Sequence, residues 1–174
     1  TATENIAALA RIRLRPRVLA GLEAVSTATT TLGLELALPV IVAPVGYLGF
    51  AHPAGERAMA RSAARNGAAM CLSTFSTTTA EDVAASAPGS ALLYQVYVFR
   101  DRVLTRELID RALASGFRGV VLTVDLAVVG KRDRERRHEW QMPDAELPAV
   151  AELLDRVGAS RGVDMLDPSL DWAY

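Results

Sequence analysis

The residues with the clearest chemical potential follow a short apolar run in the second half of the chain. Thr123 and Asp125 close the run, and Lys131 and Arg132 come a few residues later. The β-branched run is typical of a strand buried on both faces of a parallel sheet, with Thr123 and Asp125 pointing to the same side. A buried carboxylate is costly unless it is paired, so we expect Asp125 to lie beside a cation or a hydrogen-bond donor. The pattern predicts a polar site at a strand end, where α/β proteins carry their chemistry.

This run is the last of four apolar runs, which alternate along the chain with stretches of helical pattern. The expected strands are 39–45, 68–72, 92–98 and 120–124, and the expected helices are 54–66, 80–86 and 103–115. Pro53 suits a first helical turn, and Gly67 and Gly116 suit helix ends. Repeated strand–helix units imply a parallel sheet with right-handed crossovers, either a barrel or a doubly wound sheet. No GxGxxG turn follows a strand, which disfavours a classical dinucleotide fold.

The flanking regions have a different character. Residues 5–12 are weakly amphipathic, the arginine-rich stretch around Pro16 is expected to be extended and solvated, and 25–38 predicts a hairpin or an extended lead-in. We therefore divide the chain into a lead-in (1–38), four strand–helix repeats (39–124) and a loop region with the start of a further unit (125–174). All three parts are expected to belong to one unit.

The composition narrows the class of protein. With 174 residues and 51% hydrophobic residues the chain can form one core of ordinary density. A formal net charge of −1 gives no electrostatic case for nucleic-acid binding. Cys71 is the only cysteine, so we expect a buried, inert thiol and a cytoplasmic, reducing location. No apolar segment approaches the length of a membrane-spanning helix.

Metal and hydrolase chemistry find no support in the sequence. His52 belongs to a helix entry and His138 to a charged run, so neither is expected to act as a base. The chain has no pair of metal ligands at helical spacing and no GxSxG nucleophile elbow. We therefore expect no metal site.

A succession of motifs carries a specific resemblance. The motifs are LRPRVL (14–19), PVIVAPVG (39–46), HPAGE (52–56), LST (72–74), YQVYVFRDR (94–102), LTVD (122–125), GKRDRE (130–135) and DPSLDW (167–172). In this order they resemble the FMN-dependent 2-hydroxy acid oxidases and dehydrogenases, the family of glycolate oxidase, lactate oxidase and mandelate dehydrogenase. The resemblance implies a TIM (β/α)8 barrel, of which the chain matches the N-terminal half with about four βα units and the long loop after strand four.

The resemblance also implies roles for individual residues. The implied cofactor contacts, which would lie against the FMN ring or bind its polar edge, are Pro44, Val45, Gly46, Ser73, Gln95 and Thr123. The implied substrate and catalytic residues are Tyr97 (bonding the substrate hydroxyl or carboxylate), Arg132 (binding the carboxylate), Asp125 (orienting the catalytic histidine), and Phe75 and Tyr47 (lining the side-chain pocket). A small residue at Gly46 is associated in the family with room for larger substrates. The implied reaction oxidises an (S)-2-hydroxy acid to a 2-keto acid, with oxygen, a quinone or another carrier reoxidising the flavin.

Simpler interpretations of the same residues stay open. Arg132 could be a solvated arginine in a charged run, and Tyr97 and Gln95 could be packed core residues. Asp125 could cap a following helix, and Ser73 and Thr123 could be satisfied interior hydroxyls. The family's catalytic histidine motif, SNHGGR, does not occur in these residues. The alternative function is therefore a non-catalytic half-barrel or assembly module that dimerises to cover its open sheet edges, and a homo-oligomer is possible in either case. Another FMN barrel, such as a flavin-dependent isomerase, is disfavoured by the YQVY, TVD and GKR motifs.

Overall fold

Four parallel strands form the central sheet of the protein. The computed structural model describes residues 2–126, 130–131, 133–139, 151 and 166–171. The strands are β3 (Ile41–Val42), β4 (Ala69–Leu72), β5 (Leu92–Val96) and β6 (Val120–Leu122), in the spatial order β3-β4-β5-β6. Each strand pairs in parallel with the next strand along the chain. The prediction of successive strand–helix units on a parallel sheet is confirmed.

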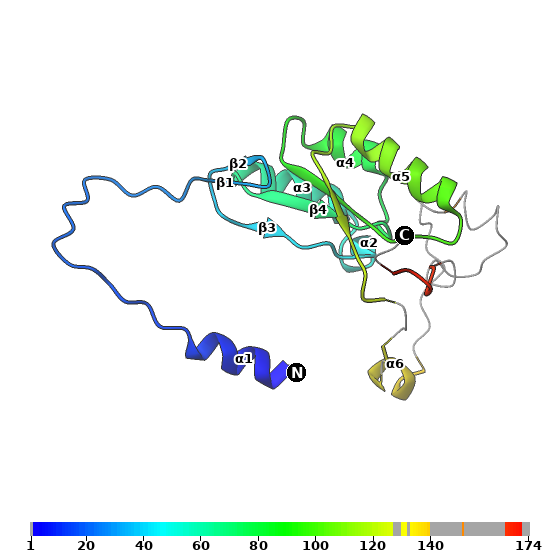
Figure 1. Cartoon of the computed structure of the whole chain (residues 1–174), viewed down its shortest axis with the longest axis horizontal. Helices are drawn as coiled ribbons and strands as arrows, with labels where there is room; N and C mark the ends of the chain where they lie inside the picture. The colour runs from blue at the N-terminus through cyan, green and yellow to red at the C-terminus, as the bar shows by residue number, and fades with distance from the viewer. Residues whose placement is uncertain (1, 127–129, 132, 140–150, 152–165, 172–174) are drawn as a thin grey trace.

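Three helices cover one face of this sheet (Figure 1). They are α3 (Gly55–Arg65), α4 (Ala80–Ser86) and α5 (Arg102–Ala114), within a residue or two of the predicted ranges. Side chains fix where two of them begin, because Thr79 accepts a hydrogen bond from the backbone N–H of Asp82 and Asp101 accepts one from Leu104. The helix α3 ends before Gly67, whose φ of 63° is the left-handed conformation of a helix C-terminus.

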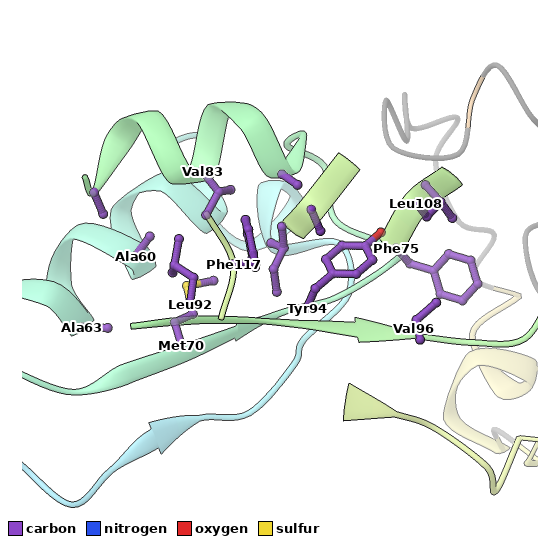
Figure 2. Close-up of a cluster of buried hydrophobic side chains, with 14 of the residues drawn as sticks. Ala60, Ala63, Met70, Phe75, Val83, Leu92, Tyr94, Val96, Leu108 and Phe117 are labelled. Atoms are coloured by element: carbon purple, nitrogen blue, oxygen red, sulfur yellow. The ribbon is translucent and has the colours of Figure 1, made fainter. Parts of the chain in front are cut away.

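The main core lies between the sheet and these helices. Figure 2 shows Leu92 and Tyr94 of β5 pointing toward the helix layer, where Val83 of α4 lies. The ring of Tyr94 meets Phe117 edge to face at a centroid distance of 5.9 Å. Alternate residues of the strands supply this core because successive side chains of a strand point to opposite faces.

A β-hairpin covers part of the opposite face. Its strands are β1 (Thr29–Thr31) and β2 (Leu34–Leu36), paired antiparallel. The two turn residues, Leu32 and Gly33, have φ values of 51° and 71°, as a tight hairpin turn of the type I′ class requires. Leu34 and Leu36 are almost fully buried against the interior-facing residues Ala69, Cys71 and Leu93. Of the two predictions for residues 25–38, the hairpin is confirmed.

The N-terminal residues lie away from this body. Helix α1 (Ala2–Arg11) stands at the end of an exposed, extended segment of residues 12–28, apart from the sheet (Figure 1). The apolar residues Ile6 and Leu9 are both more than 70% exposed. None of the described helices is long and apolar enough to cross a membrane.

Two predictions about strands were wrong. The run 39–45 forms only the two-residue strand β3, and its Ile41 is 37% exposed, while Leu122 of β6 is 52% exposed. The run 39–45 was expected to be a buried strand, and the run 120–124 a strand buried on both faces. The physical reason is position, because β3 and β6 are the two outer strands of the described sheet. The connection after β3 contains the short helix α2 (Leu48–Ala51), which the sequence did not predict.

The charged run and the DPSLDW motif are only partly described. Asp133–Arg137 forms the short helix α6. Leu166 forms a bridge with Phe99, and the carboxylate of Asp167 pairs with Arg102 at the start of α5. The segment 166–171 is thereby attached to the loop that follows β5.

Candidate active site

The predicted site residues lie on four connections that leave the carboxyl ends of the parallel strands. One group follows β3 (Pro44, Val45, Gly46, Tyr47), one follows β4 (Ser73, Phe75), one belongs to β5 and its exit (Gln95, Tyr97), and one follows β6 (Thr123, Asp125). Because parallel strands end at the same edge of a sheet, this topology gathers the four groups at one edge.

Gln95 joins three of these strand ends. Its side chain is 1% exposed, and its Oε1 accepts hydrogen bonds from the hydroxyl of Ser73 (3.3 Å) and the backbone N–H of Thr74 (3.1 Å). Its Nε2 donates to the hydroxyl oxygen of Thr123 at 2.8 Å. The backbone N–H donor fixes which amide atom is the acceptor. The three residues predicted to bind the polar edge of a flavin are therefore one hydrogen-bonded network.

At its β6 end the network leaves a hydrogen-bond donor available. Thr123 is half-buried and accepts its bond from Gln95, so its own hydroxyl proton is not used by that bond. In the part of the chain that the structure describes, no acceptor lies within hydrogen-bond distance of that proton. At the β4 end, the hydroxyl of Ser73 is committed in both directions, because it also accepts from the N–H of Phe75 at 3.2 Å.

An aromatic row runs beside the network. Its rings stack in the order Phe50, Tyr47, Phe75 and Tyr97, with successive centroid distances of 5.8, 6.2 and 5.2 Å. Tyr47 has a left-handed φ of 59°, an unusual conformation for a residue with a bulky side chain. Its backbone N–H donates to the carbonyl of Phe75 at 2.9 Å. The two residues predicted to line the substrate pocket, Tyr47 and Phe75, are in contact with each other, and Phe75 also contacts Tyr97.

The negative charge of Asp125 acts on the hydroxyl of Tyr97. Burial raises the pKa of the Tyr97 hydroxyl, and the negative charge of Asp125 raises it further. Tyr97 is therefore a neutral phenol at neutral pH and can donate a hydrogen bond. The expectation that Asp125 is buried was wrong, because its side chain is exposed at the end of the outer strand β6. Asp125 does not cap α6 either, since that helix begins at Asp133.

The backbone after β3 offers an open surface. Pro44 and Val45 are exposed and Gly46 is half-buried. A Cβ atom at Gly46 would lie 3.5 Å from Phe75 and 3.8 Å from the hydroxyl of Ser73, which is ordinary contact. Gly46 therefore leaves free a space of one methyl group between the β3 exit and the polar network. Arg132 lies outside the described residues, and its neighbour Lys131 pairs with Asp133 at 3.3 Å.

Sequence reasoning missed a buried carboxylate beside this site. Glu56, in the first turn of α3, is fully buried and accepts hydrogen bonds from the N–H and hydroxyl of Thr77 (both 2.8 Å) and the hydroxyl of Thr78 (2.9 Å). Burial alone would raise the pKa of Glu56, but these bonds outweigh it and hold the pKa below its usual 4.5. The available signals were the acidic residue in HPAGE and the threonine run 77–79.

Metal ligands do not gather in this region. Among the residues that the structure describes, no three His, Cys, Asp or Glu side chains lie close enough together to hold a metal ion. Cys71 faces the hairpin side of the sheet, and burial raises the pKa of its thiol to about 11. The donor set at the strand ends instead consists of neutral amide and hydroxyl groups beside aromatic rings. Such a set can satisfy the carbonyls and nitrogens of a flat heteroaromatic ring without adding charge.

Comparisons with known proteins point to one family. Residues 1–173 match the family model described as FMN-dependent dehydrogenase. The chain is 38% identical to an L-lactate oxidase of Nostoc sp., an alignment that covers 99% of this chain and 51% of the relative. It thus spans about half the length of the curated relatives it matches.

Solved structures agree with the sequence matches. A lactate oxidase of Pediococcus acidilactici superimposes with a TM-score of 0.87 at 25% identity, covering 97% of this chain and 45% of that one. A mandelate oxidase variant with a C4a-OH-FMN adduct superimposes with a TM-score of 0.77 at 35% identity, covering 82% of this chain and 43% of that one. The implied fold is confirmed, since the α/β architecture with a parallel sheet matches about half of these barrel enzymes.

Proposed function

The chain belongs to the FMN-dependent dehydrogenase family, and from this premise we propose that it forms one wall of the active site of an enzyme that oxidises an (S)-2-hydroxy acid to a 2-keto acid. The observation that carries the proposal is the Ser73–Gln95–Thr123 network, which joins three strand ends beside an aromatic row. When bound, FMN supplies the acceptor for the two electrons that leave the substrate.

The residues present fit such a cofactor. The open backbone of Pro44, Val45 and Gly46 gives a flat ring a surface to lie against. The amide of Gln95 and the free hydroxyl proton of Thr123 suit the nitrogen and carbonyl groups at the ring's polar edge. Ser73 would contribute chiefly by holding the amide of Gln95 in place.

The substrate would be held by groups on the β5 and β6 exits. Tyr97 stays protonated at neutral pH and would donate a hydrogen bond to the substrate's hydroxyl or carboxylate. Arg132 would bind the carboxylate with two parallel N–H donors, which orients the reacting carbon. Asp125, exposed at its strand end, would orient a catalytic histidine that these 174 residues do not supply. Tyr47 and Phe75 would line the pocket for the substrate's side chain.

A flavin titration tests the proposal. The chain is purified as part of an enzyme that also supplies the catalytic histidine and is incubated with FMN; its visible spectrum is recorded, and lactate, mandelate and glycolate are added in turn without oxygen. We expect a flavin band that one of the acids bleaches, and a loss of flavin binding in Gln95→Leu. Arg132→Met should raise the KM and lower the kcat for that acid. Flavin binding equal in the wild type and Gln95→Leu would contradict the assigned ring contacts.

A second function has one specific observation in its favour. The outer strands of the sheet expose apolar side chains, with Ile41 on β3 and Val120 and Leu122 on β6 all more than a third exposed. An assembly module without catalytic activity would bury these edges against a second copy. Sedimentation together with the FMN titration distinguishes the two functions, because a module predicts a dimer that binds no FMN.

A further inference from the structure

The Glu56 carboxylate ties together two connections that carry predicted pocket residues. Three hydrogen-bond donors to this carboxylate belong to the connection that follows β4, namely the N–H and hydroxyl of Thr77 and the hydroxyl of Thr78. Glu56 itself belongs to α3, which begins where the connection after β3 ends. A fully buried carboxylate with three donors is a fixed anchor, because leaving it without them would be costly.

The anchor extends to the β3 connection through Thr77. The hydroxyl of Thr77 donates to Glu56 and accepts a hydrogen bond from the backbone N–H of Gly49 at 3.0 Å. The contact is close-packed, since a Cβ at Gly49 would lie 2.4 Å from that hydroxyl oxygen. Gly49 is two residues from Tyr47, and Thr77 is two residues from Phe75.

The same two connections form one wall of the candidate pocket. Tyr47 stacks on Phe75 at 6.2 Å with the planes 7° apart, and its N–H donates to the carbonyl of Phe75. Tyr47 holds a left-handed backbone conformation, which costs free energy and persists only where neighbouring contacts enforce it. The contacts that can enforce it include this N–H bond, the hydrogen bond from the N–H of Phe50 to the Tyr47 carbonyl, and the nearby Gly49–Thr77–Glu56 chain.

We propose that Glu56 is a positioning residue that holds Tyr47 and Phe75 in register and thereby sets the shape of the pocket wall that meets the substrate's side chain. The inference rests on the proposed function for its consequence in substrate choice. The positioning itself concerns only this chain's own contacts. Glu56 is not a catalytic residue, because it is fully buried and its hydrogen bonds go to Thr77 and Thr78.

Amide hydrogen exchange tests the positioning without any cofactor. The variants are Glu56→Gln and Thr77→Val, the second of which keeps the Thr77 N–H bond to Glu56 and removes the hydroxyl that links it to Gly49. The matched control is Glu81→Gln, which removes the charge of an exposed glutamate in the first turn of α4, paired with Arg111. We expect exchange in residues 46–51 and 73–79 to rise about tenfold in both variants, as loss of a hydrogen bond predicts, and not in the control.

Residues 92–96 of β5 serve as the internal reference. Their exchange should stay at the wild-type rate in all variants. An equal rise in 92–96 would mean a general loss of stability and would overturn the proposal. If Glu56→Gln does not fold, Thr77→Val alone serves as the test. Exchange at the wild-type rate in residues 46–51 of Thr77→Val also overturns the proposal.

Kinetics of the flavin-loaded protein test the consequence. For Thr77→Val we compare kcat/KM for mandelate with kcat/KM for lactate, and we expect the ratio of the two to change about tenfold. The change should arise from the KM for mandelate, because the large side chain of mandelate meets the displaced pocket wall. An unchanged ratio of kcat/KM values together with faster amide exchange would show that Glu56 does not affect the choice of substrate. If the wild type reduces no flavin with any acid, the proposed function fails, and the exchange result still decides whether Glu56 holds the wall.

Discussion

A single amide side chain links three strands at the candidate site. Gln95 is buried on β5 and bonds residues that follow β4 and β6, so its two amide atoms define the spacing of the strand ends. The alternation of Gln95 and Tyr97 along YQVY could be predicted from the sequence, as could their common edge with Ser73 and Thr123. The hydrogen-bond partners of Gln95 could not be predicted, because they depend on the register between strands and lie 21–28 residues away in the sequence.

Replacing this amide should be costly in the absence of any ligand. In Gln95→Leu the N–H of Thr74 loses its acceptor inside the protein, so we expect the free energy of unfolding to fall by about 1–3 kcal/mol. Urea denaturation measures the change. Ser90→Ala is the control, since it removes a hydroxyl bond to Ala87 at the opposite end of the sheet. A variant as stable as the control would show that the network contributes little.

The cysteine is predicted to be chemically inert in the folded protein. Cys71 is 2% exposed, and its thiol pKa is raised from 9.0 to about 11, so the thiolate fraction at pH 8 falls about a hundredfold. A disulfide reagent should therefore label the native protein slowly and the urea-unfolded protein rapidly. Because Cys71 is the only cysteine, the signal has one source. Rapid labelling of the native protein would contradict the burial of Cys71.

At the scale of elements, the sequence predicted the interior better than the edges. Five elements lie close to their expected ranges, namely the helices α3, α4 and α5 and the strands β4 and β5. In these elements the spacing of the apolar residues and the residues that mark the ends of helices and strands predict the same bounds. The runs that became β3 and β6 are equally apolar, but hydrophobicity does not indicate which strands are outermost in the sheet. For the same reason the exposure of Asp125 could not be predicted.

The end of α3 offers a test of how one element is joined to the next. Gly67 has a φ of 63°, and a Cβ there would lie 2.5 Å from the Cβ of Ala37, at the exit of the hairpin. Gly89 has a φ of 73° with no atom within 4 Å of its added Cβ. Gly89→Ala should cost about 1–2 kcal/mol from backbone strain, and Gly67→Ala about 1–3 kcal/mol more from the clash.

Thermal unfolding of the two glycine variants gives the comparison. The difference between their losses of stability isolates the steric contact between the end of α3 and the hairpin, since both glycines have a left-handed backbone conformation. Equal losses would mean that the hairpin moves aside without cost. That result would argue against a firm attachment of β2 to the sheet.

At the scale of the whole molecule, acid should unfold the protein through specific carboxylates. Hydrogen bonds hold the pKa of Glu56 below 4.5, and bonds from Ser169 and Arg102 lower the pKa of Asp167 from 3.8 to about 2. Between the unfolded and folded pKa values the unfolded chain binds more protons, so stability rises with pH there. The contribution of both groups is complete above about pH 5 and is lost as the pH falls toward 2.

Chemical denaturation between pH 7 and pH 2.5 measures this dependence. The free energy of unfolding should decline below pH 5, and the decline should be shallower in a Glu56→Gln, Asp167→Asn double variant. Glu35→Gln is a suitable control, because Glu35 is an exposed residue of β2. An equally steep decline in the double variant would assign acid unfolding to other groups.

The order of the strands also bears on how the chain reaches its fold. The spatial order β3-β4-β5-β6 is the order of synthesis, so β4, β5 and β6 each pair with the strand that was made immediately before them. Within the sheet that the structure describes, each new strand–helix unit can therefore add to an edge that has already formed. The Ser73–Gln95–Thr123 network closes only when β6 joins. Its formation would therefore report, during translation, that the fourth unit has docked.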